Sequence, residues 1–412
     1  MAIPDDVAFT ILSKLPLKSL KRFTLVHKSW VDLHEIPYFM SMFRSNFLSK
    51  HQSYYDDTSL LVLQQQPSDG THCHGSLFLL SGDNFEKTVK SDWLPYQEHG
   101  RFLSVLGSGI HGILCLHEAP DYKYVLWNPA TEEFRVTPPS PRESLPYWEA
   151  YIKPHGFGYD PITDDFKVLR HITFYPDYDY GQDEYHSGVE DDNDDDDDED
   201  DDLQDEPMIS DHLPSRIPQP FWEIYSLRSN SWRKLDADMP ITGGGPDKGG
   251  DTYMNGVCNW LSYGRIYDYG FDTHLVSFNF SNEIFYTTPL PLDLADTRVQ
   301  TYLAVLNESI ALISMHEETT TFHISILGEQ GVKESWTKLF IVGLGPLHDV
   351  GLPIAVGKTG EMIFSRREKG ELALFDLSTQ MLKKEIAATG LLDYDQMVIY
   401  KESILPIGRT GY

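Results

Sequence analysis

Apolar and polar residues follow two different patterns along the chain. Up to about residue 46, large apolar side chains recur at helical spacing, which predicts several short helices. Asp5 or Asp6 can cap the first helix, where a carboxylate favours the positive end of the helix dipole. Pro16 ends that helix or opens the next, because proline cannot donate to the carbonyl four residues earlier. The apolar positions before it are Val7, Ile11, Leu12 and Leu15.

After residue 55 the pattern becomes that of β-structure. Five segments place a β-rich run before a polar turn and an aromatic or aliphatic run after it, which is typical of a β-hairpin. These segments are 125–139, 223–240, 275–291, 323–339 and 372–385. Upstream of each, we expect a turn that leads into an apolar strand, at 111–118, 155–160, 255–263, 307–315 and 358–366.

The spacing of these hairpins predicts a β-propeller. Turn centres near 230, 282, 330 and 379 are about 50 residues apart, the period of kelch-like blades. An insertion at roughly 171–220 accounts for the longer interval before residue 230. Residues 58–100 supply a further strand set, and the lone strand 396–405 is expected to close the ring by pairing into the first blade. We predict a mainly β protein of six blades, with seven as the alternative, behind a small helical domain.

Charge is distributed unevenly. The net charge is −30, but residues 177–206 contain 18 Asp or Glu and no Lys or Arg. Self-repulsion and few apolar side chains predict that 177–212 form a disordered acidic insertion within the propeller. The first 50 residues carry seven basic and four acidic side chains. A weakly basic head on an acidic body argues against a nucleic-acid-binding protein.

The small helical head has too few residues to sustain a core by itself. Its apolar side chains therefore need another surface. Either the helices dock on the β-body as a cap, or one face is reserved for a separate protein.

The order of residues favours the second interpretation, a face reserved for a separate protein. Ile3-Pro4, Leu15-Pro16, Arg22-Phe23, Lys28-Ser29-Trp30 and Pro37 with Phe39 follow the pattern of the F-box, which this segment closely resembles. Ile3 replaces the usual Leu, and His27 stands where many plant members have Cys.

The resemblance implies a docking module for the Skp adaptor of SCF ubiquitin ligases, and through it a cullin scaffold. The contact residues that it implies are Ile3, Pro4, Val7, Ile11, Leu12, Leu15, Pro16, Leu20 and Phe23. The segments GSGIHGILCL, LWNPATEEF and GFGYDPITDDFKVLR also resemble the F-box-associated domain of plant F-box proteins. We therefore expect an F-box at 1–46, an F-box-associated propeller at 55–406 and the insertion at 177–212.

Motifs that would carry chemistry are absent or incomplete. Gly107, Gly109 and Gly112 match a dinucleotide-binding pattern, but a strand rather than a helix is expected to follow them. His72 and His74 would lie on the strand face opposite Cys73, which disfavours a metal site. The acidic run 191–202 lacks the Gly and Glu of an EF-hand loop. No catalytic residues and no cofactor are expected.

The N-terminus lacks the features of a signal peptide, no apolar run is long enough to span a bilayer, and three distant cysteines give no disulfide framework. We expect a cytoplasmic or nuclear protein without membrane contact. The favoured function is a non-catalytic substrate receptor, which brings a target protein to a ubiquitin ligase. A non-degradative F-box interaction protein and, with less support, a propeller enzyme or glycan-binding module remain alternatives.

The target is not identified by the sequence. Aromatic residues expected in loops are candidate anchors for it, because aromatic side chains dominate binding hot spots. They could equally fill gaps between blades. These residues are Tyr147, Trp148, Tyr267 and Tyr269.

Overall fold

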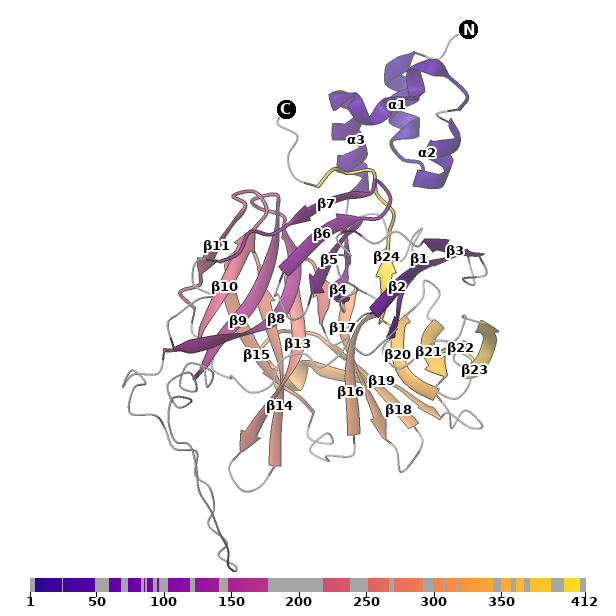
Figure 1. The fold of residues 1–412 in the computed structure, drawn as a ribbon. Helices are drawn as coiled ribbons and strands as arrows, with labels where there is room; N and C mark the ends of the chain where they lie inside the picture. The colour runs from indigo at the N-terminus through magenta and orange to yellow at the C-terminus, as the bar shows by residue number, and fades with distance from the viewer. Residues whose placement is uncertain are drawn as a thin grey trace, which may run out of the picture.

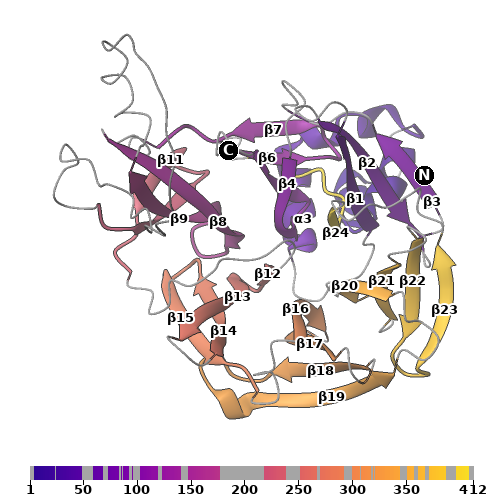
Figure 2. The same cartoon turned by 60° about the horizontal axis from the view of Figure 1, so that its bottom comes forward.

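A computed structural model shows a ring of six four-stranded sheets with a group of short helices on one side (Figures 1 and 2). Both the described N-terminal residues and the C-terminal segment lie on that side of the ring. The structure describes residues 4–407 except 24, 49–58, 68–72, 83–84, 86, 92–94, 96–102, 119–122, 141–146, 177–217, 238–250, 267–269, 292–298, 307, 317–318, 320, 344–349, 357–360, 367–370 and 387–395.

The head consists of three α-helices and two short 3₁₀ helices. They are α1 (Asp5–Leu12), α2 (Leu17–Phe23), η1 (Lys28–Trp30), η2 (Leu33–Glu35) and α3 (Pro37–Phe47). Pro4 occupies the position before α1, so Asp5 and Asp6 lie in the first helical turn instead of capping it. Their carboxylates still favour the positive end of the helix. Pro37 opens α3, where its missing N–H costs no hydrogen bond.

Each blade is a four-stranded antiparallel sheet, and the inner strands face the axis of the ring (Figure 2). Six blades are present, as the spacing predicts. In chain order the strands are β1 (Ser59–Pro67), β2 (Cys73–Ser81), β3 (Lys87–Ser91), β4 (Leu103–Ile110), β5 (Ile113–Glu118), β6 (Lys123–Asn128), β7 (Glu133–Val136), β8 (Trp148–Asp160), β9 (Asp165–Pro176), β10 (Phe221–Ser226), β11 (Ser231–Lys234), β12 (Thr252–Met254), β13 (Val257–Ile266), β14 (Gly270–Asn279), β15 (Ile284–Pro289), β16 (Val299–Leu306), β17 (Ser309–His316), β18 (Thr321–Leu327), β19 (Trp336–Gly343), β20 (Val350–Val356), β21 (Glu361–Arg366), β22 (Glu371–Asp376), β23 (Met381–Ile386) and β24 (Gln396–Tyr400).

The five expected hairpins are the outer strand pairs of five blades. Four of their turns end on a residue with left-handed backbone, a geometry that lets a short loop match the strand twist. These are Glu132 (φ 62°), Asn230 (φ 49°), Glu283 (φ 60°) and Gln380 (φ 55°). In the β18–β19 connection Gly331 (φ 82°) takes the equivalent place, four residues after the end of β18. The repeat read from the sequence is thus a repeat of one turn geometry.

One expected turn was placed wrongly. His111-Gly112 and Asn255-Gly256 form tight turns with two consecutive positive φ angles, as expected. His155-Gly156 instead lies inside β8, and the turn follows at 161–164. Gly156 is required there for packing, because an added Cβ would lie 2.6 Å from Sγ of Cys258 in the neighbouring blade. The same dipeptide therefore serves a turn in one blade and a close approach in the next.

The last strand closes the ring. β24 pairs antiparallel with β1, from Ser59 opposite Tyr400 to Leu63 opposite Gln396. This confirms the expected pairing into the first blade, although the strand ends at Tyr400 and residues 401–407 continue as irregular chain towards the head. The strands that flank the acidic segment also pair as neighbours, with Phe221 opposite Ile172. The segment 177–212 itself lies outside the described residues.

Candidate functional site

The head has a core of its own, and the body completes it. Seven large apolar side chains of the head and Leu405 of the C-terminal segment are buried together. Phe9 packs edge-to-face on Phe39, with ring centroids 5.8 Å apart. The head residues of this core are Leu12, Leu17, Leu20, Leu33, Phe39, Met40 and Phe43. The head therefore docks on the body along one side, as the cap reading requires, and only its outer side remains free for another protein.

The residues implied by the F-box resemblance divide between these two sides. Val7 (45% exposed) and Ile11 (53%) lie one turn apart on α1 and face outward, and Phe23 at the end of α2 is 40% exposed. Pro4 and Pro16 are exposed and Leu15 is half-buried, whereas Leu12 and Leu20 lie in the head core. Ile3 lies outside the described residues.

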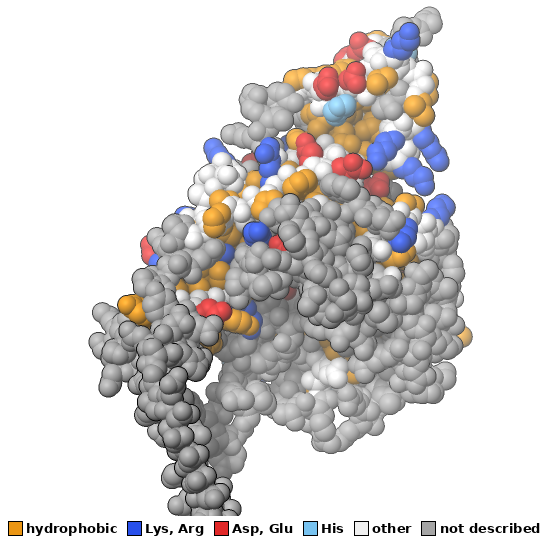
Figure 3. All heavy atoms as spheres, in the orientation of Figure 1, with side chains coloured by type: hydrophobic (Ala, Val, Ile, Leu, Met, Phe, Trp, Pro, Cys, Tyr) orange, Lys and Arg blue, Asp and Glu red, His pale blue; other side chains and the backbone are white. Residues whose placement is uncertain are grey.

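Four further apolar side chains of the head are exposed, and the contact residues implied by the F-box resemblance do not include them. Seven of the nineteen large hydrophobic side chains that are exposed in the described residues belong to the head. Figure 3 shows hydrophobic side chains on the head among charged ones. The four are Leu25, Val26, Val31 and Tyr38. Three of them lie outside the α-helices, where helical periodicity does not apply, and Val31 lines the cavity between the head and the body.

Exposed basic side chains accompany these apolar side chains along the head. Lys14, Lys18, Arg22 and Lys28 are exposed, as is Lys21, which lines the cavity on the inner side. An apolar centre with a charged rim is the usual composition of a protein-binding surface. We call Val7, Ile11, Phe23, Leu25 and Val26 the outer face of the head.

On the inner side, polar contacts fix the head to the body. Arg44 of α3 forms an ion pair with Asp164, and its guanidinium donates to the Tyr159 hydroxyl at 3.3 Å. That hydroxyl donates in turn to Asp164 Oδ1 at 2.6 Å. The Phe47 ring packs on His111, with centroids 6.5 Å apart. Burial, with a smaller contribution from the Arg44 cation, lowers the pKa of His111 to about 4. The contact between head and body therefore contains a neutral histidine at neutral pH.

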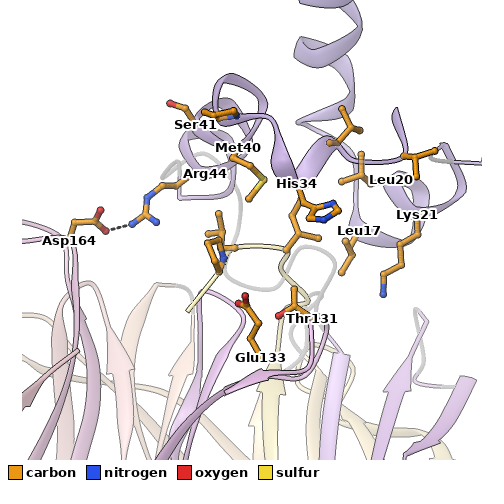
Figure 4. A pocket seen from close by; sticks show the side chains of 16 residues that line it. Leu17, Leu20, Lys21, His34, Met40, Ser41, Arg44, Thr131, Glu133 and Asp164 are labelled. Carbon is orange, nitrogen blue, oxygen red and sulfur yellow. Dashed lines mark hydrogen bonds and ion pairs between the residues drawn. The ribbon is translucent and has the colours of Figure 1, made fainter. Parts of the chain in front are cut away.

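A cavity of about 710 Å³ remains beside these contacts (Figure 4). Leu17, Leu20 and Met40 line it from the head, and Thr131 and Glu133 line it from the body. The head therefore contacts the body around this cavity, through Arg44 and through Leu405 of the C-terminal segment.

The candidate target anchors differ from one another in exposure. Tyr147 is 41% exposed, whereas Trp148 is 8% exposed and packs with Ile152, Ile172 and Phe174 inside the blade. Trp148 therefore fills the blade. Tyr267 and Tyr269 lie outside the described residues.

The described residues provide no group of three or more His, Cys, Asp or Glu that could hold a metal ion. Gly107 and Gly109 lie in β4, and Gly112 lies in the tight turn to β5, so a strand follows the glycine pattern and no helix there presents its N-terminus to a pyrophosphate. Burial raises the pKa of the Cys115 and Cys258 thiols, which keeps both protonated and unreactive. Within the described part of the chain, no helix is long and apolar enough to cross a membrane.

Comparison with known proteins agrees with this architecture. Residues 208–401 match the family model of the F-box associated beta propeller domain. The putative F-box protein At3g16210 of Arabidopsis thaliana is 27% identical over 41% of this chain and 41% of its own length. F-box protein At2g21930 is 31% identical over 40% of this chain and 39% of its own length. The putative F-box protein At4g21240 is 25% identical over 88% of this chain and 75% of its own length. All three come from the same plant.

The chain therefore spans about 40% of the length of two of these relatives and 75% of the length of the third. Among solved structures, the nidogen/laminin complex aligns with 83% of this chain at 10% identity and a TM-score of 0.40, a similarity too weak to inform function.

Proposed function

We propose that this chain, which belongs to the plant F-box proteins with an F-box associated β-propeller, is the substrate-recognition subunit of an SCF-type ubiquitin ligase. The F-box at 1–46 binds a Skp-type adaptor, and through it a cullin. The propeller at 55–406, interrupted by the acidic insertion 177–212, binds the target protein. The chain supplies proximity and no bond chemistry, and it works in the cytoplasm or the nucleus.

The observation that supports this proposal is the division of the head into two sides. Its inner side is already occupied by Leu405 and the body, while Val7, Ile11 and Phe23 on the outer side remain exposed. Large apolar side chains gathered on a surface mark a protein-interaction site. Of the nine contact residues implied by the F-box resemblance, those that face outward are the ones we assign to direct contact with the adaptor, and Leu12 and Leu20 support them from beneath.

The test replaces two outward residues by aspartate. In the Val7→Asp/Ile11→Asp protein, two carboxylates would have to be desolvated in an apolar interface, at a cost of several kcal/mol. Since about 1.4 kcal/mol is tenfold in affinity, we expect the adaptor to bind at least a hundredfold more weakly. Affinity for a purified Skp-type adaptor is measured by calorimetry, with circular dichroism to check that the β-signal is unchanged.

The matched control is Ile284→Asp/Ile341→Asp. These side chains are 48% and 52% exposed on β15 and β19, the outermost strands of two blades on the side of the ring away from the head, so the same chemical change is made outside the head (Figure 1). The control should bind the adaptor like the unaltered protein. If the head variant also bound normally, the outer face would not be the adaptor site. Ubiquitin transfer to a captured target would then separate a receptor from a non-degradative interaction protein.

A further inference from the structure

The third blade carries a two-stranded arm that extends beyond the rest of its sheet. β8 and β9 pair along their whole length, from Asp160 opposite Asp165 to Trp148 opposite Pro176. The next strand, β10, pairs with β9 only as far as Ile172. Within the part of the chain that the structure describes, residues 148–151 and 173–176 therefore form a hairpin extension with no third strand beside it. Figures 1 and 2 show these long strands at the rim of the ring.

The two faces of this arm differ in character. One face is apolar and buried, with Trp148 and Phe174 packed in a single cluster. The other face carries Tyr151 (50% exposed) and Tyr175 (56% exposed) beside the exposed carboxylate of Glu149. The tyrosine rings are arranged edge-to-face, with centroids 6.1 Å apart. These tyrosines do not fill a gap between blades, since half of each side chain is open to solvent.

The arm is attached to the most acidic part of the chain. β9 ends at Pro176, and the following residues 177–206 contain 18 Asp or Glu without a single Lys or Arg. The chain returns to the blade at Phe221, opposite Ile172 at the base of the same arm. Concentrated negative charge attracts cationic partners and speeds their association, while it repels phosphate groups. The charge therefore opposes nucleic acids and anionic lipid surfaces as occupants of the arm.

We propose that Glu149, Tyr151 and Tyr175 form a docking surface for an arginine-rich segment of a partner protein. A guanidinium stacks on an exposed tyrosine ring through cation–π attraction. It also forms paired hydrogen bonds with a carboxylate, which a lysine ammonium cannot do in the same geometry. If the chain is the receptor proposed above, this segment belongs to its target, and the inference rests on that function only for the identity of the partner.

The test uses the full-length protein and three fluorescein-labelled peptides of sixteen residues. Eight arginines, lysines or glutamates alternate with serine or glycine in the three peptides. Affinity is measured by fluorescence anisotropy at low and at physiological salt. We expect the arginine peptide to bind at least fivefold more tightly than the lysine peptide and the glutamate peptide not to bind. In Tyr151→Ala/Tyr175→Ala, the arginine peptide should fall to the affinity of the lysine peptide.

Two further variants distinguish ring stacking from loss of structure. Tyr151→Phe/Tyr175→Phe retains both aromatic faces and should retain the preference for arginine. Phe134→Ala removes a 42% exposed aromatic ring from another blade and should leave both affinities unchanged. Melting curves show whether each variant is folded.

Equal binding of the arginine and lysine peptides by the unaltered protein would overturn the proposal. An arginine preference that persists in Tyr151→Ala/Tyr175→Ala would overturn it too, because residues other than the two tyrosines would then select arginine. Adaptor affinity is measured on the same proteins. The arm variants should bind the adaptor normally, and Val7→Asp/Ile11→Asp should bind the arginine peptide normally, so a failure of one proposal does not imitate a failure of the other.

Discussion

Asn128 is expected to be one of the most sensitive polar positions in the protein. Its side chain is completely buried at the end of β6. The amide nitrogen donates to the carbonyl oxygens of Ser403 at 3.0 Å and Leu405 at 2.9 Å, while its Oδ1 accepts from the Ala130 N–H at 3.0 Å. The first two bonds hold the C-terminal segment, and through Leu405 this segment enters the head core.

A matched control exists in the repeat itself. Asn279 ends the equivalent strand β14, and its Oδ1 accepts from the N–H groups of Ser281 at 2.9 Å and Asn282 at 3.3 Å, so both asparagines cap a hairpin turn through Oδ1. Only Asn128 also bonds the C-terminal segment. The difference between Asn128→Ala and Asn279→Ala therefore reports mainly on those two hydrogen bonds.

Each hydrogen bond contributes about 1 kcal/mol net, and a buried carbonyl left without a partner costs about 1–3 kcal/mol. Asn128→Ala should therefore destabilise the protein by about 2–4 kcal/mol more than Asn279→Ala does. The entropy of unfolding is about 2.1 cal/mol/K per residue, so for a propeller of roughly 350 residues each kcal/mol lowers the melting temperature by about 1.5 °C. We therefore expect a difference of roughly 3–6 °C between the variants by circular dichroism, with the same order in urea denaturation. Equal melting temperatures would refute the assignment of Asn128 as the link between blade and C-terminal segment.

Two other predictions concern buried ionisable side chains. Burial raises the pKa of the Asp251 carboxyl from 3.8 to about 7. Between these two values the folded protein holds a proton that the unfolded chain has released. The free energy of unfolding therefore falls as the pH rises towards 7, and it levels off above that pH. Relative to Asp251→Asn, the free energy of unfolding of the unaltered protein should fall by about 1 kcal/mol from pH 6 to pH 8, and a pH-independent difference would contradict this. Arg170 and Glu223 form a fully buried ion pair at 2.7 Å, with the guanidinium 3.7 Å from the Trp232 ring centroid. Arg170→Ala should cost about 3–5 kcal/mol in urea denaturation, whereas Arg170→Met/Glu223→Leu should cost less, because it leaves no unpaired charge.

The propeller could be predicted from the sequence because its repeat is local. Each outer hairpin has a polar turn between two apolar strands, and both parts lie within about fifteen residues of each other. The closing strand could be predicted because an unpaired edge is unfavourable. The role of Gly156 could not be predicted, because the Cys258 side chain that excludes a Cβ lies about a hundred residues further along the chain.

The candidate site on the head was predicted only in part, for a related reason. Val7, Ile11 and Leu12 fall within one apolar stripe of a two-turn helix, and periodicity alone does not separate the residues that face outward from those that face the body. Here Leu12 is 3% exposed and Ile11 is 53% exposed. What separates them is Leu405, which fills the core of the head from almost four hundred residues away.

The C-terminal segment therefore explains two features that are unrelated in the sequence. Ser403 packs so closely on the β4–β5 turn that a Cβ on Gly112 would lie 2.3 Å from its own Cβ, and it accepts a hydrogen bond from Asn128. Gly112 and Asn128 both belong to the segments that resemble the F-box-associated domain. The need for glycine at one position and asparagine at the other follows from the same C-terminal segment, which crosses the blade and ends in the head core. In the proposed receptor this segment fixes the orientation of the head on the propeller. It thereby sets the separation between adaptor and target, on which proximity-driven transfer depends.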